Sequence, residues 1–283
     1  MDKDKSANNE QTKVLLINDI AGYSKISLGA MIPIMSHMGF GIHNLPTAVV
    51  SNTLDYGKFE ILETTEYMKG TLKVWKELGF SFDAICTGFI VSEEQVKVVA
   101  DFCQEQRKNG VRIFVDPIMG DNGSLYNGVS DNTVEYMRKI CSVADIIMPN
   151  FTEAVFLADK HFSTEGVSLS EAKELVDSLR NLGSKSVVIT SITVEGQTCV
   201  YGYDDDKSEY FNIPFDYIPV HMPGTGDIFS ALLVGSVLKG IELQSSTAFA
   251  MRKLRELILL NKDNEDKTSG IPIEKYLNDM TNF

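Results

Sequence analysis

Short runs of apolar residues alternate with longer amphipathic stretches along most of this chain. The short runs are rich in Val, Ile and Leu and are bounded by polar or turn-forming residues, which is typical of buried strands. The strands predicted in this way are Lys13–Ile17, Gly41–Leu45, Ala84–Thr87, Arg112–Val115, Ile146–Met148 and Ser186–Thr190. A hairpin is expected from Gln197–Tyr203 and Glu209–Ile213, joined by the acidic turn Asp204–Asp206.

The amphipathic stretches predict helices between these strands. Glu63–Leu78 has apolar residues at helical spacing, acids early and lysines late, as the helix dipole favours. Ser92 is expected to cap another helix. The remaining helices are predicted at Ile26–His37, Glu171–Asn181, Asp227–Lys239 and Ser246–Leu260. This alternation predicts a three-layer α/β/α fold, with a mostly parallel central sheet flanked by helices.

The composition predicts a globular protein without a membrane partner. The chain has 283 residues, 43% of them hydrophobic, which suffices for a large core. No internal repeat or linker divides it, so residues 13–283 are expected to form one domain after a polar, loose leader at residues 1–12. No apolar run approaches the roughly 20 residues of a membrane span.

The charge and the cysteines argue against two other classes of protein. A net charge of -13 argues against a long basic face that could bind nucleic acid. A nucleotide remains compatible, because helix ends and a metal can make a site locally positive. The four cysteines are widely spaced and form no C-x-x-C pair, so we expect buried free thiols, no zinc site and a cytoplasmic location.

The segment Pro223–Ala231 carries the most specific chemical signal. Two glycines and Thr225 precede Asp227, and an apolar helix follows. Such a turn can aim backbone N–H groups at one point, and its glycines let a ligand come close. Asp227 could then accept a proton from an attacking hydroxyl, so the segment suits phosphoryl transfer to an alcohol. The alternative is an ordinary helix start with Thr225 or Asp227 as its cap.

Polar segments follow several of the predicted strands. In a doubly wound sheet, ligands bind beyond the carboxyl ends of the strands, so these segments predict a site on one rim. They are Asn18–Tyr23, Thr87–Phe89, Asp116–Asp121, Pro149–Glu153 and Thr190–Ser191.

Asn150 and Glu153 allow two interpretations. Three residues apart at a helix start, they can form a capping box. Alternatively, Glu153 holds Mg²⁺ directly or through water, with Asp116 as a second anchor, because Mg²⁺ prefers a few carboxylates together with water and phosphate oxygens.

These segments together resemble the ribokinase superfamily, and within it the pyridoxal (vitamin B6) kinases. Gly224–Asp227 is similar to the closing motif of the superfamily. The motifs that resemble the pyridoxal kinases are Asp116–Asp121, Pro149–Asn150 with Glu153, Val188–Ser191, Ser51–Thr53 with Tyr56–Phe59, and Thr87–Phe89. The match runs in order from Val14 to Leu260.

The resemblance implies ATP-dependent phosphorylation of the 5′-hydroxymethyl group of pyridoxal, pyridoxine or pyridoxamine, on a ribokinase-like fold. Asp227 would be the base, and Gly224, Thr225 and Gly226 would hold the transferred phosphoryl group. The nucleotide side would comprise Asp116, Asn150, Glu153, Thr190, Ser191 and Tyr126, the last in a flap at 122–129. Glu153 and Asp116 would act on Mg²⁺, and the vitamer side would comprise Asp19, Thr47, Tyr56 and Phe89.

Departures from the family pattern leave the substrate open. Asp19 stands where the family usually has a small polar residue, Phe89 replaces a frequent Tyr, and Tyr23–Lys25 replaces a more glycine-rich stretch. The alternatives are a hydroxymethylpyrimidine kinase of thiamine synthesis and, in another class, a catalytically silent nucleotide-binding protein. The resemblance also implies a homodimer and leaves open a monovalent cation such as K⁺.

Overall fold

One large sheet organises the protein. The structure is a computed structural model that describes residues 11–126, 129, 132–161 and 166–280. Its main sheet has the strand order β11-β10-β9-β8-β5-β4-β1-β2-β3. The strands from β9 to β2 are parallel, whereas β3, β10 and β11 are antiparallel to their neighbours. The predicted mostly parallel sheet is therefore confirmed.

The strands have the following bounds: β1 Lys13–Tyr23, β2 Gly41–Asn52, β3 Ile61–Glu63, β4 Ala84–Thr87, β5 Arg112–Val115, β8 Ile146–Ile147, β9 Ser186–Val194, β10 Gln197–Asp204 and β11 Glu209–Pro214. A small separate hairpin is formed by β6 (Gly120–Asp121) and β7 (Ser124–Leu125).

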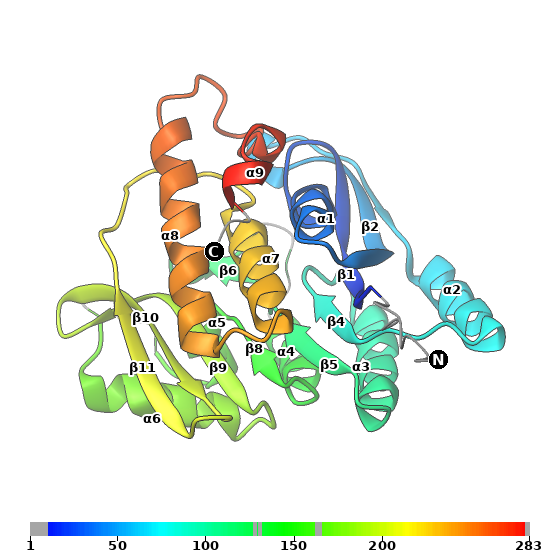
Figure 1. The fold of residues 1–283 in the computed structure, drawn as a ribbon, viewed down its shortest axis with the longest axis horizontal. Coiled ribbons are helices and arrows are strands. Elements are labelled where there is room, and N and C mark those ends of the chain that lie inside the picture. Colours follow the sequence, from blue (N-terminus) through cyan, green and yellow to red (C-terminus); the bar gives the residue numbers. More distant parts are fainter. Residues whose placement is uncertain (1–10, 127–128, 130–131, 162–165, 281–283) are drawn as a thin grey trace, which may run out of the picture.

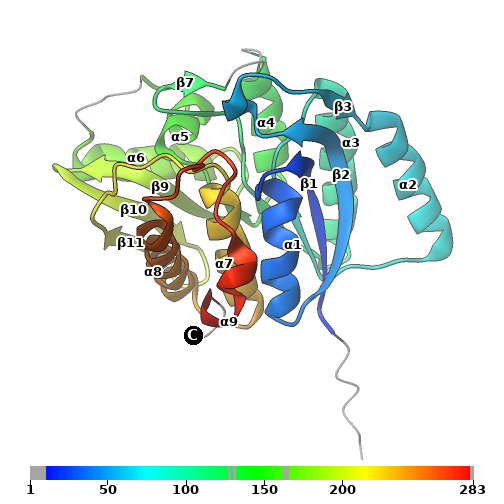
Figure 2. The same ribbon diagram turned by 90° about the horizontal axis from the view of Figure 1, so that it is seen from above.

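Helices cover both faces of the sheet, as Figure 2 shows. One layer contains α1 (Ser27–His37), α7 (Thr225–Leu238), α8 (Leu243–Asn261) and the short α9 (Leu277–Met280). The other contains α2 (Thr65–Leu78), α3 (Glu93–Lys108), α4 (Thr133–Cys141), α5 (Phe151–Leu157) and α6 (Leu169–Arg180). The ribbon in Figure 1 labels these elements. The expected three-layer α/β/α fold is confirmed.

The alternation of side chains along β1 explains why both faces need helices. Val14 and Leu16 pack into the core shared with α1 and α7, whereas Leu15 and Ile17 pack into the core on the opposite face. Successive side chains of a strand point to opposite faces, so a strand of continuous apolar residues is buried on both sides.

The ends of β1 and β2 differ from the prediction. The sequence pattern placed the end of the first strand at Ile17 and the end of the second at Leu45, but the two strands continue side by side to Tyr23 and Asn52. The register between them shifts between Asn18 and Ile20. This irregularity admits polar residues into a strand whose earlier part is apolar, which hydrophobic runs alone do not reveal.

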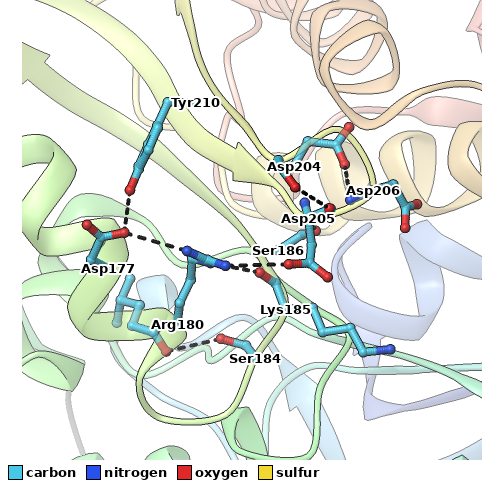
Figure 3. A network of polar contacts seen from close by, with 11 residues as sticks. Asp177, Arg180, Ser184, Lys185, Ser186, Asp204, Asp205, Asp206 and Tyr210 are labelled. Atoms are coloured by element: carbon cyan, nitrogen blue, oxygen red, sulfur yellow. Dashed lines mark hydrogen bonds and ion pairs between the residues drawn. The ribbon is translucent and has the colours of Figure 1, made fainter.

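Ion pairs and hydrogen bonds join α6 to the β10–β11 turn (Figure 3). Arg180 pairs with Asp205 at 3.4 Å and with Asp177 at 3.7 Å, and its guanidinium lies 3.6 Å from the centre of the Tyr203 ring. The hydroxyl of Tyr210 donates to Asp177. This network fastens the antiparallel edge of the sheet to a helix of one layer.

A small cavity of about 300 Å³ lies beside this network, at the amino-terminal ends of β5, β8 and β9. The carboxylate of Asp145 pairs there with Lys185 at 2.9 Å and with Arg107 at 3.5 Å. Asp145 also accepts the N–H of Ile113 at 2.9 Å. These paired charges hold the strand ends together, which is a structural role.

Several expectations about composition can be compared with the structure. Cys86, Cys103, Cys141 and Cys199 are buried free thiols, as predicted. None of the helices in the described ranges has both the length and the apolar character of a membrane span. Residues 1–10 of the expected leader, and residues 127 and 128 of the expected flap, lie outside the described residues.

Candidate functional site

A cavity of about 720 Å³ lies at the carboxyl ends of the parallel strands. The extended ends of β2 and β3 form one wall, where the paired residues Val50 and Ile61 line it. The predicted site residues that line it are Asp19, Phe89, Asp116, Tyr126, Asn150, Glu153, Thr190, Gly224, Thr225, Gly226 and Asp227. Thr47, Tyr56 and Ser191 are not among its lining residues.

Asp227 lies in the first turn of α7, with only 8% of its surface exposed. Its Oδ2 accepts the backbone N–H of Ser27 at 2.8 Å, and its Oδ1 accepts the side-chain amide of Asn18 at 3.1 Å. Burial raises the pKa of Asp227 to about 7. A carboxyl with a pKa near neutrality is well matched to take up a proton at physiological pH.

The glycine turn presents backbone donors to the same cavity. α7 begins at Thr225, and no side chain caps it. The first N–H groups of a helix have no partner within the helix, so those of Thr225 to Asp227 can bind an anion. A Cβ at Gly226 would meet no atom within 4 Å, which leaves room for a ligand against the backbone.

Gly224 is required by its conformation and by a close neighbour. It has a φ of 84°, and a Cβ there would lie 2.5 Å from the carbonyl oxygen of Lys25. A Cβ on Gly270 would approach that oxygen to 2.9 Å. The N–H of Lys25 donates to the carbonyl of Ser269 at 2.9 Å. The loop before α1, the glycine turn and the segment before α9 are therefore packed together at one carbonyl group.

The capping box at the start of α5 is present. The Asn150 side chain accepts the N–H of Glu153 at 3.0 Å, and the Glu153 carboxylate accepts the N–H of Asn150 at 2.8 Å. The other oxygen of Glu153 accepts the N–H of Met119 at 3.1 Å. Burial raises the pKa of Glu153, with Asp116 adding a like charge. The capping box thus lies on the cavity wall, so the position of Glu153 is compatible both with capping α5 and with an action on Mg²⁺.

Asp116 lies on the cavity wall, next to α7. Its Oδ2 accepts the hydroxyl of Ser230 at 2.8 Å, and burial raises its pKa to about 7. Ser230 belongs to the cavity lining but was not among the predicted site residues. Its position one helical turn after Asp227 is the signal that could have indicated it.

Phe89 is held from both ends of its backbone. Its N–H donates to the Asn18 side chain at 2.8 Å, and its carbonyl accepts the Thr47 hydroxyl at 2.8 Å. Thr47 therefore lies behind Phe89, fully buried, and contacts the cavity only through it. Asn18 belongs to the predicted rim segment Asn18–Tyr23 but was given no role, and Ser27 was not assigned to the site at all.

Tyr56 and Asp55 connect the β2–β3 side of the cavity to other parts of the chain. The Tyr56 hydroxyl donates to Asp266 at 2.7 Å, and its ring packs at 6.0 Å from the ring of Tyr23. The carboxylate of Asp55 lies 2.9 Å from the imidazole of His221. Tyr56 therefore lies beside the cavity, between the lining residues Asp55 and Gly57, without lining it itself.

The cavity is acidic. Its lining includes the carboxyl groups of Asp19, Asp55, Asp116, Asp121, Glu153 and Asp227. No Lys or Arg belongs to that lining in the part of the chain that the structure describes. An anionic ligand therefore depends on the helix N-terminus and on cations that accompany it.

Known proteins resemble this chain over most of its length. The phosphomethylpyrimidine kinase family matches residues 33–270. A protein from Bacteroides thetaiotaomicron, described as a "putative phosphomethylpyrimidine kinase" and crystallised with pyridoxal, is 35% identical. Its structure superposes with a TM-score of 0.90 over 96% of this chain and 96% of that chain. The ribokinase-like fold and the expected family resemblance are confirmed.

Two curated relatives are pyridoxal kinases by name. The pyridoxal kinase of Arabidopsis thaliana is 31% identical over 66% of this chain and 62% of its own length. The "putative pyridoxal kinase C18.10" of Schizosaccharomyces pombe is 29% identical over 67% of this chain and 57% of its own length. The chain thus spans about three fifths of the length of these two curated relatives.

Proposed function

Because this chain belongs to the phosphomethylpyrimidine kinase family, we propose that it transfers the γ-phosphoryl group of ATP to the 5′-hydroxymethyl group of a B6 vitamer. The observation that carries the proposal is the juxtaposition of the buried Asp227 carboxyl and the uncapped N-terminus of α7 in one cavity. The pyridoxal bound by the Bacteroides relative supports a vitamer as the acceptor.

The reaction needs a base and a place for negative charge. The acceptor hydroxyl attacks the γ-phosphorus, a new O–P bond forms, and the bond to the oxygen that bridges the β- and γ-phosphorus atoms breaks to release ADP. Asp227 takes the hydroxyl proton on a carboxylate oxygen. The N–H groups of the Gly224–Gly226 turn stabilise the phosphoryl oxygens during the transfer. Since Asp227 must be ionised, the rate should fall below about pH 7.

A divalent cation fits the acidic part of the cavity. The described residues contain no cluster of three or more His, Cys, Asp or Glu side chains that could hold a metal ion by themselves. Mg²⁺ does not need such a cluster, because it takes one or two carboxylates and completes its shell with water and phosphate oxygens. Asp116 would contribute a carboxylate oxygen and Glu153 would act through water, and the ion would neutralise phosphate charge.

A hydroxymethylpyrimidine is the second candidate acceptor, and the name of the matched family favours it. A pyrimidine of this kind also carries a primary alcohol on a small aromatic ring, so the base and the glycine turn would serve both substrates. The difference lies in the ring pocket around Asp19 and Phe89.

An ATP-dependent screen tests the proposal. Pyridoxal, pyridoxine, pyridoxamine and hydroxymethylpyrimidine are each incubated with ATP and Mg²⁺, and the product mass is measured. We expect a phosphorylated vitamer, with turnover abolished by excess chelator. Asp227→Asn serves as the control and should lower the rate by about 10²–10⁴-fold while leaving nucleotide binding nearly unchanged. Phosphorylation of the pyrimidine alone would select the second candidate, and no turnover of any alcohol would support a silent nucleotide-binding protein.

The proposal includes three finer properties that the family resemblance implies. They are a homodimer, a cytoplasmic location and a role for K⁺ beside Mg²⁺. Sedimentation equilibrium decides the first, and replacement of K⁺ by Na⁺ in the assay decides the last.

A further inference from the structure

Asn18 connects the two sides of the cavity. It lies in β1 with 1% of its surface exposed. Its Nδ2 donates to Oδ1 of Asp227 at 3.1 Å, and its Oδ1 accepts the N–H groups of Phe89 at 2.8 Å and of Asp19 at 3.0 Å. Two backbone donors require an oxygen and a carboxylate requires a donor, so only one orientation of the amide satisfies all three partners.

The surroundings of Asn18 leave no alternative place for its side chain. A Cβ on Gly88 would lie 2.5 Å from Cγ of Asn18, so the glycine makes room for the amide. On the other side, the Sδ atom of Met31 lies 3.6 Å from Nδ2. The Asn18 side chain is therefore confined between the end of β4 and helix α1.

We propose that Asn18 is a positioning residue that fixes the Asp227 carboxylate relative to the backbone of Phe89. The proposal rests on the proposed function of Asp227 as the base. Phe89 lines the ring side of the cavity, and Asp227 lies where the acceptor hydroxyl must react. One rigid amide that bonds to both keeps the ring and the base at a constant separation, which a reaction of this kind requires.

The Asn18 amide also influences the protonation of Asp227. A donor to a carboxylate favours its charged form, so the amide lowers the pKa of Asp227 and opposes the effect of burial. The carboxyl groups of Asp19 from β1 and Asp116 after β5 act in the opposite direction and raise the pKa of Asp227. Cys86 from β4 and Tyr126 after β7 also face Asp227, but their own pKa values are raised, so they are neutral where Asp227 titrates.

The substitution Asn18→Asp removes the hydrogen bond that Asn18 donates to Asp227 but keeps those that it accepts from Phe89 and Asp19. One carboxylate oxygen can still accept the N–H groups of Phe89 and Asp19, but the other now faces Asp227 without a donor. Two carboxylates separated by about the 3.1 Å that now divides Nδ2 of Asn18 from Oδ1 of Asp227 raise each other's proton affinity. We expect the acidic limb of the pH–rate profile to move up by about one pH unit or more, with the KM for the vitamer changed less than about twofold.

Three variants complete the design. Thr47→Val removes only the hydroxyl that holds the Phe89 carbonyl, so it should raise the KM for the vitamer and leave the acidic limb in place. Met31→Leu removes only the weak contact of Sδ with Nδ2 of Asn18 and keeps the volume and the hydrogen bond to Asp227, so it should move the acidic limb much less than Asn18→Asp does. Gly88→Ala should displace the Asn18 side chain and move the acidic limb in the same direction as Asn18→Asp.

A titration by carbon-13 NMR reads the same effect without turnover. The carboxyl resonance of Asp227 is assigned by its loss in Asp227→Asn, and its midpoint should rise in Asn18→Asp. Because the signal comes from folded protein, a lower Tm of the variant does not hide it. Coincident titrations of wild type and Asn18→Asp would overturn the role of Asn18. Failure of the wild type to phosphorylate any candidate would instead contradict the proposed function, while the titration would still decide the role of Asn18.

Discussion

Asp19 is the residue that we expect to set the preference of the proposed site among the vitamers. Only 5% of its surface is exposed, and burial raises its pKa. Its carboxyl lies on the cavity wall, on the side of Phe89. An ionised carboxylate there can pair with a cationic aminomethyl group, whereas a protonated one can only share a hydrogen bond.

We predict that Asp19→Ser lowers kcat/KM for the preferred vitamer by about tenfold or more, since a hydrogen bond to a charged group is lost. The KM for ATP should change less. Any preference for pyridoxamine should shrink, and in the wild type that preference should grow with pH as Asp19 ionises. Steady-state kinetics with the three vitamers measure these effects. Equal losses for all vitamers, together with a lower Tm, would show that Asp19 is structural.

The same short motif lies in two different surroundings in two helices. α5 and α6 both begin with a complete capping box, formed by Asn150 with Glu153 and by Ser168 with Glu171. Burial raises the pKa of Glu153, whereas hydrogen bonds from Ser168 lower the pKa of the exposed Glu171. The second box is therefore a control, within the same chain, for capping without a neighbouring cavity.

We expect Glu153→Gln to raise the Mg²⁺ concentration for half-maximal rate by about 10- to 100-fold, as loss of a group that orients a metal ion does. Glutamine can still accept the N–H of Asn150 in a capping box, but its NH2 group cannot accept the N–H of Met119, so a modest fall in Tm should accompany the change. Glu171→Gln should leave the Mg²⁺ dependence unchanged. A normal Mg²⁺ dependence of Glu153→Gln would mean that Glu153 only caps α5.

Sequence patterns predicted the buried strands at the centre of the sheet better than strand ends and edge strands. Ala84–Thr87 and Arg112–Val115 have the predicted bounds, because their apolar residues are buried on both faces. The short edge strand β3 gave no signal, since all of Ile61–Glu63 is exposed. The bond from Asn18 to Asp227 joins residues 209 positions apart, and no local pattern encodes such a contact.

Across the whole molecule, the acidic cavity reduces the stability of the fold. Burial raises the pKa of Asp116 to about 7, whereas in an unfolded chain its value would be near 3.8. Between these two pH values the folded state binds a proton that the unfolded state has lost. The free energy of unfolding therefore falls as the pH rises from 3.8 to about 7, and it stays reduced above that pH. Functional sites commonly carry such a cost in stability.

We predict that Asp116→Asn raises the Tm at pH 8, by about 2–4 °C for each kcal/mol of strain removed. The gain should shrink as the pH is lowered towards 5, while activity falls at all pH values. Scanning calorimetry across this range measures the difference. Asp216→Asn is the control, since that side chain is 93% exposed and should give no pH-dependent gain. A constant difference between pH 5 and 8 would contradict the assigned cause.

The shared contact at the Lys25 carbonyl also has a consequence for biosynthesis. Gly224 and Gly270 both pack against a loop that leaves the ribosome long before they do. At roughly 5–20 residues per second, the loop would wait about 10–50 s for these partners. During that interval β1 presents the apolar side chains of Val14 and Leu16, and the polar Asn18, without α7 to cover them. Nascent chains stalled before residue 224 should therefore bind holding chaperones, and phosphate-binding capacity should emerge only late in translation.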